Sequence, residues 1–198
     1  MKKERYEWIQ SWCDEADRED KPRVLLVGDS ITRGYQQFVR ERLAGVCYVD
    51  YVATSYAIDN KMYQTLVEGV AKNSRYDVIH VNHGLHGIHV SPRTYKSRLR
   101  DLCLRIRGGG KLILAECTAV YRAGNKRLNA EWAKRIRERN EILGELATQL
   151  DCELDRLYEV SMDLPKEWRD PDGVHYLEEG YGALAYEVVK CLKGVMRI

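Results

Sequence analysis

The sequence is poor in features of membrane proteins and of nucleic-acid-binding proteins. It carries 32 basic and 30 acidic residues, a net charge of +2, so there is little excess positive charge to attract a polyanion. Its apolar runs fall far short of the roughly 20 residues that a membrane-spanning helix needs. The first residues begin basic but lack the apolar stretch of a signal peptide. We therefore expect a cytoplasmic protein with neither a nucleic-acid nor a membrane partner.

Cysteine pairs and glycine-rich phosphate loops are missing as well. The six cysteines are scattered without a Cys-x-x-Cys pair, and a chain of this kind without an export signal is expected to keep them reduced. Neither Gly-x-x-x-x-Gly-Lys-Ser/Thr nor Gly-x-Gly-x-x-Gly occurs in the turn after the first strand-like segment. This excludes the two common nucleotide-binding turns there, and we expect no cofactor.

What the chain does have is a regular alternation of short apolar runs and longer helical patterns. Hydrophobic residues make up 44% of its 198 residues, enough for the core of one domain. The pattern predicts strands at 23–27, 46–53, 77–81, 111–116 and 152–154, and helices at 31–43, 60–72, 92–107, 126–150 and 177–192. Continuous apolar strands separated by helices are typical of a parallel sheet covered on both faces. We predict an α/β fold with a doubly wound, flavodoxin-like strand order.

Residues 1–22 precede this alternation. The apolar residues Tyr6, Trp8, Ile9 and Trp12 recur there at helical spacing. We therefore predict an N-terminal helical extension, packed on the domain or on a second copy of the chain, followed by a single domain over 23–198. A homo-oligomer stays open.

The turn after the first predicted strand, residues 28–34 (GDSITRG), places Ser30 at the start of a helix. Free backbone N–H groups and the helix dipole favour negative charge there, as a nucleophile in acyl transfer requires. A serine at this position can equally be a simple helix cap.

A second block near the end of the sequence favours the chemical interpretation. In residues 170–175 (DPDGVH), Asp172 precedes His175 by three positions on an Asp-Gly turn, close enough for the carboxylate to orient the imidazole. Together with Ser30 they supply a nucleophile, a base and an orienting acid. A capping or buried histidine is the plainer alternative for His175.

With these two blocks the sequence resembles the SGNH, or GDSL-type, hydrolases. Residues 28–31 look like the first block of that family and residues 172–175 like its last, followed by a Gly-Tyr helix start at 180–181. The resemblance covers residues 23–192. It implies a three-layer α/β/α sandwich with a five-stranded parallel sheet. It also implies metal-free ester hydrolysis through an acyl-serine intermediate, with Ser30, Asp172 and His175 as catalytic residues.

The two middle blocks of the family, which supply oxyanion donors, are altered here. Tyr56 stands where a glycine N–H is expected, and its own N–H could donate if the turn needs no positive φ. His86 takes the place of an asparagine, and an imidazole N–H can donate as an amide can. We predict an oxyanion hole made by Ser30, Tyr56 and His86, with Asn82 as the second candidate for the side-chain donor.

The predicted substrate is an oxygen ester of a short acyl group, acetyl above all, on a carbohydrate or another small molecule. Aromatic side chains can stack on sugar rings, and we expect Asp29, Asn82 and Trp168 to contact the substrate. The alternative is a catalytically weakened, ligand-binding member of the same fold.

Two further clusters have plainer interpretations. Four histidines recur at every third position: His80, His83, His86 and His89. Because the first belongs to a strand and glycines at 84 and 87 interrupt any helix, we predict no metal site. The basic run at 134–139 is interleaved with glutamates, so we predict a solvated helix face.

Overall fold

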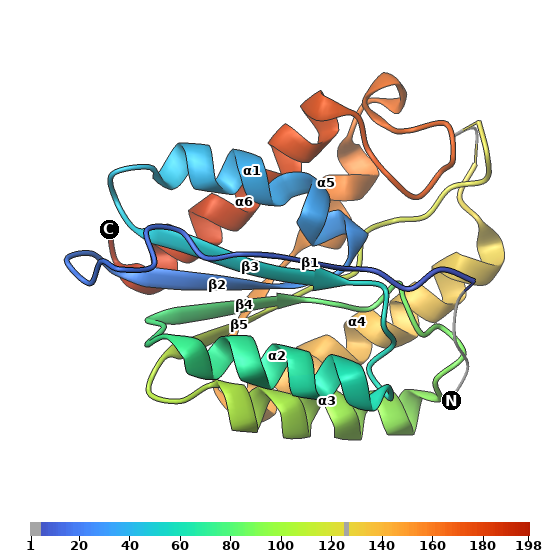
Figure 1. The fold of residues 1–198 in the computed structure, drawn as a ribbon. Helices are drawn as coiled ribbons and strands as arrows, with labels where there is room; N and C mark the ends of the chain where they lie inside the picture. Colours follow the sequence, from blue (N-terminus) through green and yellow to red (C-terminus); the bar gives the residue numbers. More distant parts are fainter. Residues whose placement is uncertain (1–4, 125–126) are drawn as a thin grey trace.

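The computed structural model describes residues 5–124 and 127–198, which form a central β-sheet between two layers of helices (Figure 1). Helices α1, α5 and α6 cover one face, and α2, α3 and α4 cover the other. In chain order the elements are β1 (Ile9–Trp12), β2 (Arg23–Gly28), α1 (Ser30–Leu43), β3 (Tyr48–Thr54), α2 (Lys61–Asn73), β4 (Val78–Asn82), α3 (Pro92–Ile106), β5 (Lys111–Ala115), α4 (Ala130–Leu150), β6 (Glu153–Asp155), α5 (Leu157–Asp163), a short 3-10 helix (Lys166–Trp168) and α6 (Glu178–Met196).

The sheet has six strands in the order β1-β3-β2-β4-β5-β6. The five strands from β2 onward are parallel, and their order is that of a flavodoxin-like sheet, so the predicted fold class is confirmed. The predicted count of five is one too low, because β1 adds an antiparallel edge strand to β3.

The N-terminal helix is a wrong prediction: Ile9–Trp12 is a β-strand. The spacing of its aromatic residues fits a helix, but Trp8 and Trp12 also share one face of a strand. That face meets α1, where the Arg33 guanidinium lies 4.6 Å from the Trp8 ring centre and Arg40 lies 4.8 Å from that of Trp12. The open edge of β3 and these two cations favour an extended conformation over the local helical pattern.

The other predicted elements occur with shifted ends. Helix α4 begins at Ala130, after the N-cap Asn129, whereas the predicted start at Lys126 lies outside the described residues. Helix α5 was not predicted. In the part of the chain that the structure describes, no helix combines the length and apolar character needed to cross a bilayer.

The core follows the central strands. Every residue of β2, β3 and β4 is buried, because both faces of the sheet are covered. Strand β2 lies between β3 and β4. The connection from β2 to β3 therefore runs toward one edge of the sheet, and the next connection, from β3 to β4, runs back toward the other edge. In parallel sheets such a reversal opens a crevice beyond the carboxyl ends of the strands, where ligands bind.

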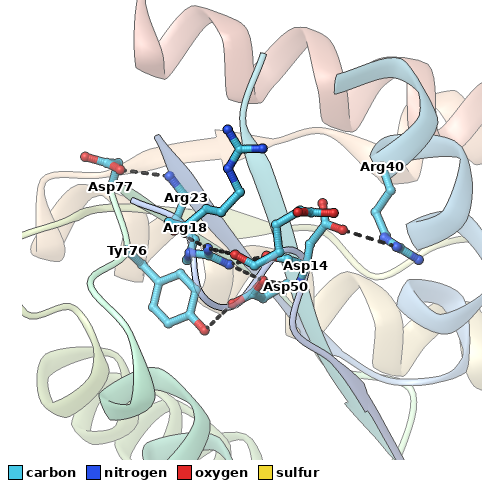
Figure 2. Close-up of polar contacts among 8 residues, drawn as sticks. Asp14, Arg18, Arg23, Arg40, Asp50, Tyr76 and Asp77 are labelled. Atoms are coloured by element: carbon cyan, nitrogen blue, oxygen red, sulfur yellow. Dashed lines mark hydrogen bonds and ion pairs between the residues drawn. The ribbon is translucent and has the colours of Figure 1, made fainter. Parts of the chain in front are cut away.

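A polar cluster at the opposite, amino end of the sheet anchors the N-terminal segment (Figure 2). The buried Arg23 guanidinium donates to Asp50 Oδ1 at 2.9 Å and to the backbone carbonyls of Asp14, Glu15 and Arg18. The other Asp50 oxygen accepts from the Tyr76 hydroxyl at 2.8 Å. Because these donors and acceptors satisfy one another, the cluster holds the loop between β1 and β2 against the sheet.

Candidate active site

Ser30 is the first residue of α1, directly beyond the carboxyl end of β2. Asp29 caps the helix by accepting from the Ile31 N–H at 3.0 Å. The turn needs glycine at position 28, since a Cβ there would collide with the Thr32 side chain and the Asn82 carbonyl. As the first helical residue, Ser30 has an N–H without a partner inside the helix. A hydroxyl and a free donor thus share the positive end of α1.

The turn at 170–175 brings a histidine to this serine across 145 residues of sequence. His175 Nε2 lies 2.9 Å from Ser30 Oγ, and His175 Nδ1 lies 2.6 Å from Asp172 Oδ2. The three side chains therefore form one hydrogen-bonded chain. Because Nδ1–H donates to the carboxylate, the lone pair of Nε2 faces the serine hydroxyl.

The Asp172 carboxylate is itself held by the backbone of the turn. Its Oδ1 accepts from the N–H groups of Val174 and His175, at 2.7 and 2.9 Å. Burial raises the pKa of this carboxyl, but the hydrogen bonds from the His175 N–H, the His175 side chain and the Val174 N–H outweigh it and lower the pKa below its usual range. Asp172 is therefore ionised at neutral pH and can stabilise a positive imidazolium.

Glycine is required inside this turn. Gly173 has φ +81°, and a Cβ there would collide with the Tyr121 carbonyl. The Tyr121 N–H donates to the Gly173 carbonyl at 2.7 Å, which ties the turn to the segment after β5. The position of His175 is thus set by the end of the sheet as well as by α6.

The predicted oxyanion donors are placed differently from one another. Tyr56 has no positive φ, as its predicted role requires, but its N–H donates to Thr54 Oγ1 at 3.2 Å. His86 lies half-buried in the turn after β4, with its ring edge-on to Trp8 at 6.3 Å. The Ser30 N–H lies at the amino terminus of α1. The oxyanion hole formed by Ser30, Tyr56 and His86 stays a prediction.

Two polar residues predicted to contact the substrate are buried and bonded to the protein. The Asn82 amide donates to the Glu116 carbonyl at 2.9 Å, toward β5. Asp29 accepts weakly from the N–H groups of Gly84 and Leu85, at 3.5 and 3.4 Å, in addition to capping α1. These bonds give both side chains a role in joining neighbouring strand ends.

Trp168 is half-buried and lies just before the turn that carries His175. It lies in an open groove on the helical layer formed by α1 and α6, lined also by Phe38, Arg42 and Tyr186. The lining of this groove includes neither Ser30 nor His175. The predicted contact of Trp168 with the substrate stays a prediction.

Three side chains near the site were given no role there by the sequence analysis: His83, Trp8 and Arg139. His83 is buried, and its Nε2 bonds the Tyr56 carbonyl at 2.9 Å, which links the turns after β3 and β4. Burial lowers its pKa to about 4, so its ring is neutral at neutral pH. The sequence pattern predicts Trp8 in a helix and Arg139 on a solvated face, whereas Trp8 precedes a β-strand and Arg139 is buried.

The assignment of Arg139 is a wrong prediction, since its side chain is buried. The guanidinium donates to the Gly87 carbonyl at 2.8 Å and lies 3.7 Å from the Tyr95 ring centre. The neighbouring Arg135 donates to the Ile88 carbonyl at 2.9 Å. Helix α4 thus holds the turn that carries His86.

The four regularly spaced histidines have separate surroundings. His80 pairs with Asp155 at 2.9 Å in the core, and His89 lies 3.9 Å from Asp59. Over the described residues, 5–124 and 127–198, no group of three or more histidine, cysteine, aspartate or glutamate side chains is arranged to hold a metal ion.

Comparison with known proteins shows a clear structural likeness. No model of a sequence family matches this chain, and no curated protein sequence does. Many solved structures are similar to it, and three examples match over most of their length. A lipase/acylhydrolase from Enterococcus faecalis has a TM-score of 0.70 at 19% identity, covering 87% of this chain and 96% of that one. A catalytic mutant of an acetylxylan esterase from Geobacillus stearothermophilus has a TM-score of 0.70 at 16% identity, covering 86% and 94%.

The third similar structure carries the name of the family itself. It is a member of the lipolytic protein G-D-S-L family from Veillonella parvula, with a TM-score of 0.65 at 19% identity, covering 85% of this chain and 96% of that one. At such identities the likeness concerns the fold. This chain has the fold of the SGNH, or GDSL-type, hydrolases.

Proposed function

We propose that the protein is a serine esterase that removes a short acyl group, acetyl above all, from an oxygen ester. The observation that carries the proposal is the hydrogen-bonded chain from Ser30 through His175 to Asp172 at the amino end of α1. This constellation can activate a hydroxyl toward a carbonyl carbon. The shared fold with esterases and acylhydrolases agrees with this reaction class.

The reaction has two halves. Ser30 Oγ attacks the ester carbonyl while His175 Nε2 takes its proton, and Asp172 stabilises the imidazolium. The tetrahedral intermediate then collapses, the C–O bond to the alcohol breaks, and His175 returns the proton to the leaving oxygen. A water molecule, deprotonated by His175, then attacks the acyl-serine. As the bond between the acyl carbon and Ser30 Oγ breaks, His175 returns the proton to Oγ and the carboxylic acid leaves.

The negative oxygen of each intermediate is stabilised by N–H groups at the amino end of α1 and in the neighbouring turns. We assign this role to the Ser30 N–H and to an imidazole N–H of His86. The Tyr56 N–H joins them when it exchanges its bond to Thr54 Oγ1 for the oxyanion, because that bond is long at 3.2 Å.

For the alcohol half of the ester we propose a sugar. The acetylxylan esterase with the same fold supports this choice. A panel of acetylated mono- and oligosaccharides identifies the class of sugar by the acetate released.

The catalytic proposal is tested with an active-site-directed fluorophosphonate. We expect one adduct on the purified protein, located at Ser30 by peptide mass analysis. The matched control is Ser30→Ala, which should give none while folding normally. An unmodified parent protein that also fails to hydrolyse p-nitrophenyl acetate would overturn the proposal. That result would favour the alternative, a ligand-binding protein with this fold.

The assignment of His86 is tested by two substitutions that differ in hydrogen bonding. His86→Ala removes the donor and should lower kcat about a hundred- to a thousandfold. His86→Asn supplies an amide N–H and should keep most of the activity. Steady-state kinetics on p-nitrophenyl acetate compare the two. An alanine variant as active as the parent would remove His86 from the oxyanion hole.

A further inference from the structure

We propose that Trp8, carried by the N-terminal edge strand, forms the wall that limits the length of the acyl group. The inference rests on the proposed esterase function and concerns the specificity of the same site. The inference depends on the contacts of Trp8 with Arg33 and His86. Trp8 lies outside residues 23–192, the part of the chain that resembles the family.

The register of β1 places Trp8 beyond the carboxyl end of β3. Ile9 pairs with Thr54, the last residue of β3, so the residue before Ile9 extends past the strand toward the site. The Trp8 N–H donates to Ser55 Oγ at 2.9 Å, and its carbonyl accepts from Thr54 Oγ1 at 2.7 Å. The backbone of Trp8 is therefore held by the turn after β3.

The Trp8 ring contacts one residue of α1 and one residue of the turn after β4. The guanidinium of Arg33, one helical turn after Ser30, lies 4.6 Å from the Trp8 ring centre. On another side the ring meets His86 edge-on, at 6.3 Å and an interplanar angle of 81°. The half-buried indole thus borders both the helix that carries the serine and the turn that carries the assigned oxyanion donor.

The direction of the acyl group follows from the topology of the sheet. Strands β1 and β3 lie on one side of β2, and β4, β5 and β6 lie on the other. The turn with His175 is tied to the segment after β5. Because His175 returns its proton to the leaving oxygen, the alcohol lies toward that side. The acyl chain then extends away from His175, toward the turn after β3 and Trp8.

The strand that carries Trp8 is held at its far end too. The Asp14 N–H donates to Asp50 Oδ1 at 2.8 Å, within the cluster of Figure 2. At the near end, Ser55 Oγ donates to Glu7 Oε2 at 2.9 Å. These bonds hold the backbone on both sides of Trp8, and the ring contacts with Arg33 and His86 restrain the indole itself, so the ring can act as a wall that excludes longer chains.

The test compares Trp8→Ala with Trp12→Ala. Trp8 directly precedes β1 and Trp12 ends it, and each ring lies under an arginine of α1. Of the two, Trp8 is the one whose ring also contacts His86. The readout is kcat/KM for p-nitrophenyl acetate, butyrate and hexanoate. In Trp8→Ala we expect the hexanoate-to-acetate ratio to rise by at least about tenfold, as a pocket enlarged by more than one methylene allows. Trp12→Ala should keep the parent ratio.

Two results would overturn the proposal that Trp8 limits the length of the acyl group. One is an unchanged ratio in a Trp8→Ala variant that still reacts with the fluorophosphonate at Ser30. The other is an equal rise in Trp12→Ala, which would indicate general loosening. If Trp8→Ala does not fold, Trp8→Leu provides the same comparison with a smaller expected rise, and its unchanged ratio would also count against the wall. A parent protein without an adduct at Ser30 contradicts the esterase proposal instead, so the two failures are distinguishable.

Discussion

Two aspartates precede His175, and only one of them bonds its imidazole. Asp172 Oδ2 is 2.6 Å from His175 Nδ1. Asp170 Oδ1 instead accepts from the Asp172 N–H at 2.9 Å, which shapes the turn. The choice between them could be predicted from the sequence, since three residues with a glycine allow a tight turn that returns to the imidazole.

We expect Asp172→Asn to lower kcat by about 10³–10⁴, because an amide favours the wrong imidazole tautomer and cannot stabilise the imidazolium. Asp170→Asn keeps an oxygen acceptor for the Asp172 N–H and should lower kcat less than about tenfold. Initial rates with p-nitrophenyl acetate at saturating substrate make the comparison. The reverse ranking would assign the orienting role to Asp170.

His83 makes stability depend on pH. Its pKa is lowered to about 4 by burial, from an ordinary value near 6.5. Between these values the unfolded chain binds more protons than the folded one, so the free energy of unfolding rises with pH from about 4 to 6.5 and levels off above. The lowered pKa corresponds to roughly 3 kcal/mol of stability, lost as the pH falls through this window.

We expect His83→Gln to remove most of this slope, because an amide can keep the bond to the Tyr56 carbonyl without titrating. Urea denaturation at several pH values from 4 to 7.5 measures it for both proteins. Parallel pH profiles of parent and variant would show that other groups cause the dependence.

At the scale of elements, α4 determines the shape of the turn after β4. The Arg139 guanidinium crosses the helix surface to the Gly87 carbonyl, and Gly87 itself has φ +71°. A charged residue in a helix with many charges is ordinarily solvated. Its burial here depends on a loop 52 residues earlier in the chain, so the local pattern of 134–139 could not predict it.

We expect Arg139→Met to lower both stability and kcat. The substitution keeps the length of the side chain but leaves the Gly87 carbonyl without its donor, at a cost of about 1–3 kcal/mol in unfolding free energy. The loosened turn should also lower kcat on p-nitrophenyl acetate, since it carries His86, while fluorophosphonate labelling of Ser30 persists. The control Arg137→Met, on the exposed face of α4, should leave both quantities near the parent values. Equal effects in the two variants would contradict the role of Arg139.

At the scale of the whole molecule, the N-terminal segment is part of the domain. The buried pair of Arg23 and Asp50 attaches its loop at the amino end of the sheet, and β1 continues along β3 to the carboxyl end (Figures 1 and 2). One segment therefore joins the structural cluster at one end to the candidate active site at the other.

We expect Arg23→Met to lower the free energy of unfolding by about 3–5 kcal/mol, because the Asp50 carboxylate is left buried without its cation. The control Arg18→Met removes an exposed pair with Asp20 and should change the free energy of unfolding far less than Arg23→Met does, because solvent screens exposed ion pairs. Denaturant titrations at pH 7 measure both. A loss below 1 kcal/mol in Arg23→Met would show that the loop is attached by other contacts.

The sequence by itself determined the α/β class, the flavodoxin-like order and the pairing of Ser30 with residues 172–175. The class and the strand order follow from local periodicity and from the handedness of the connections. The pairing of Ser30 with residues 172–175 was predicted from two sequence blocks that resemble those of a known family. The tertiary structure alone decided that residues 9–12 form an edge strand and that Arg139 is buried. The open edge of β3 and the Gly87 carbonyl become partners of these residues only when the chain is folded. Where such partners compete with a local pattern, the contact with the larger gain in free energy determines the structure.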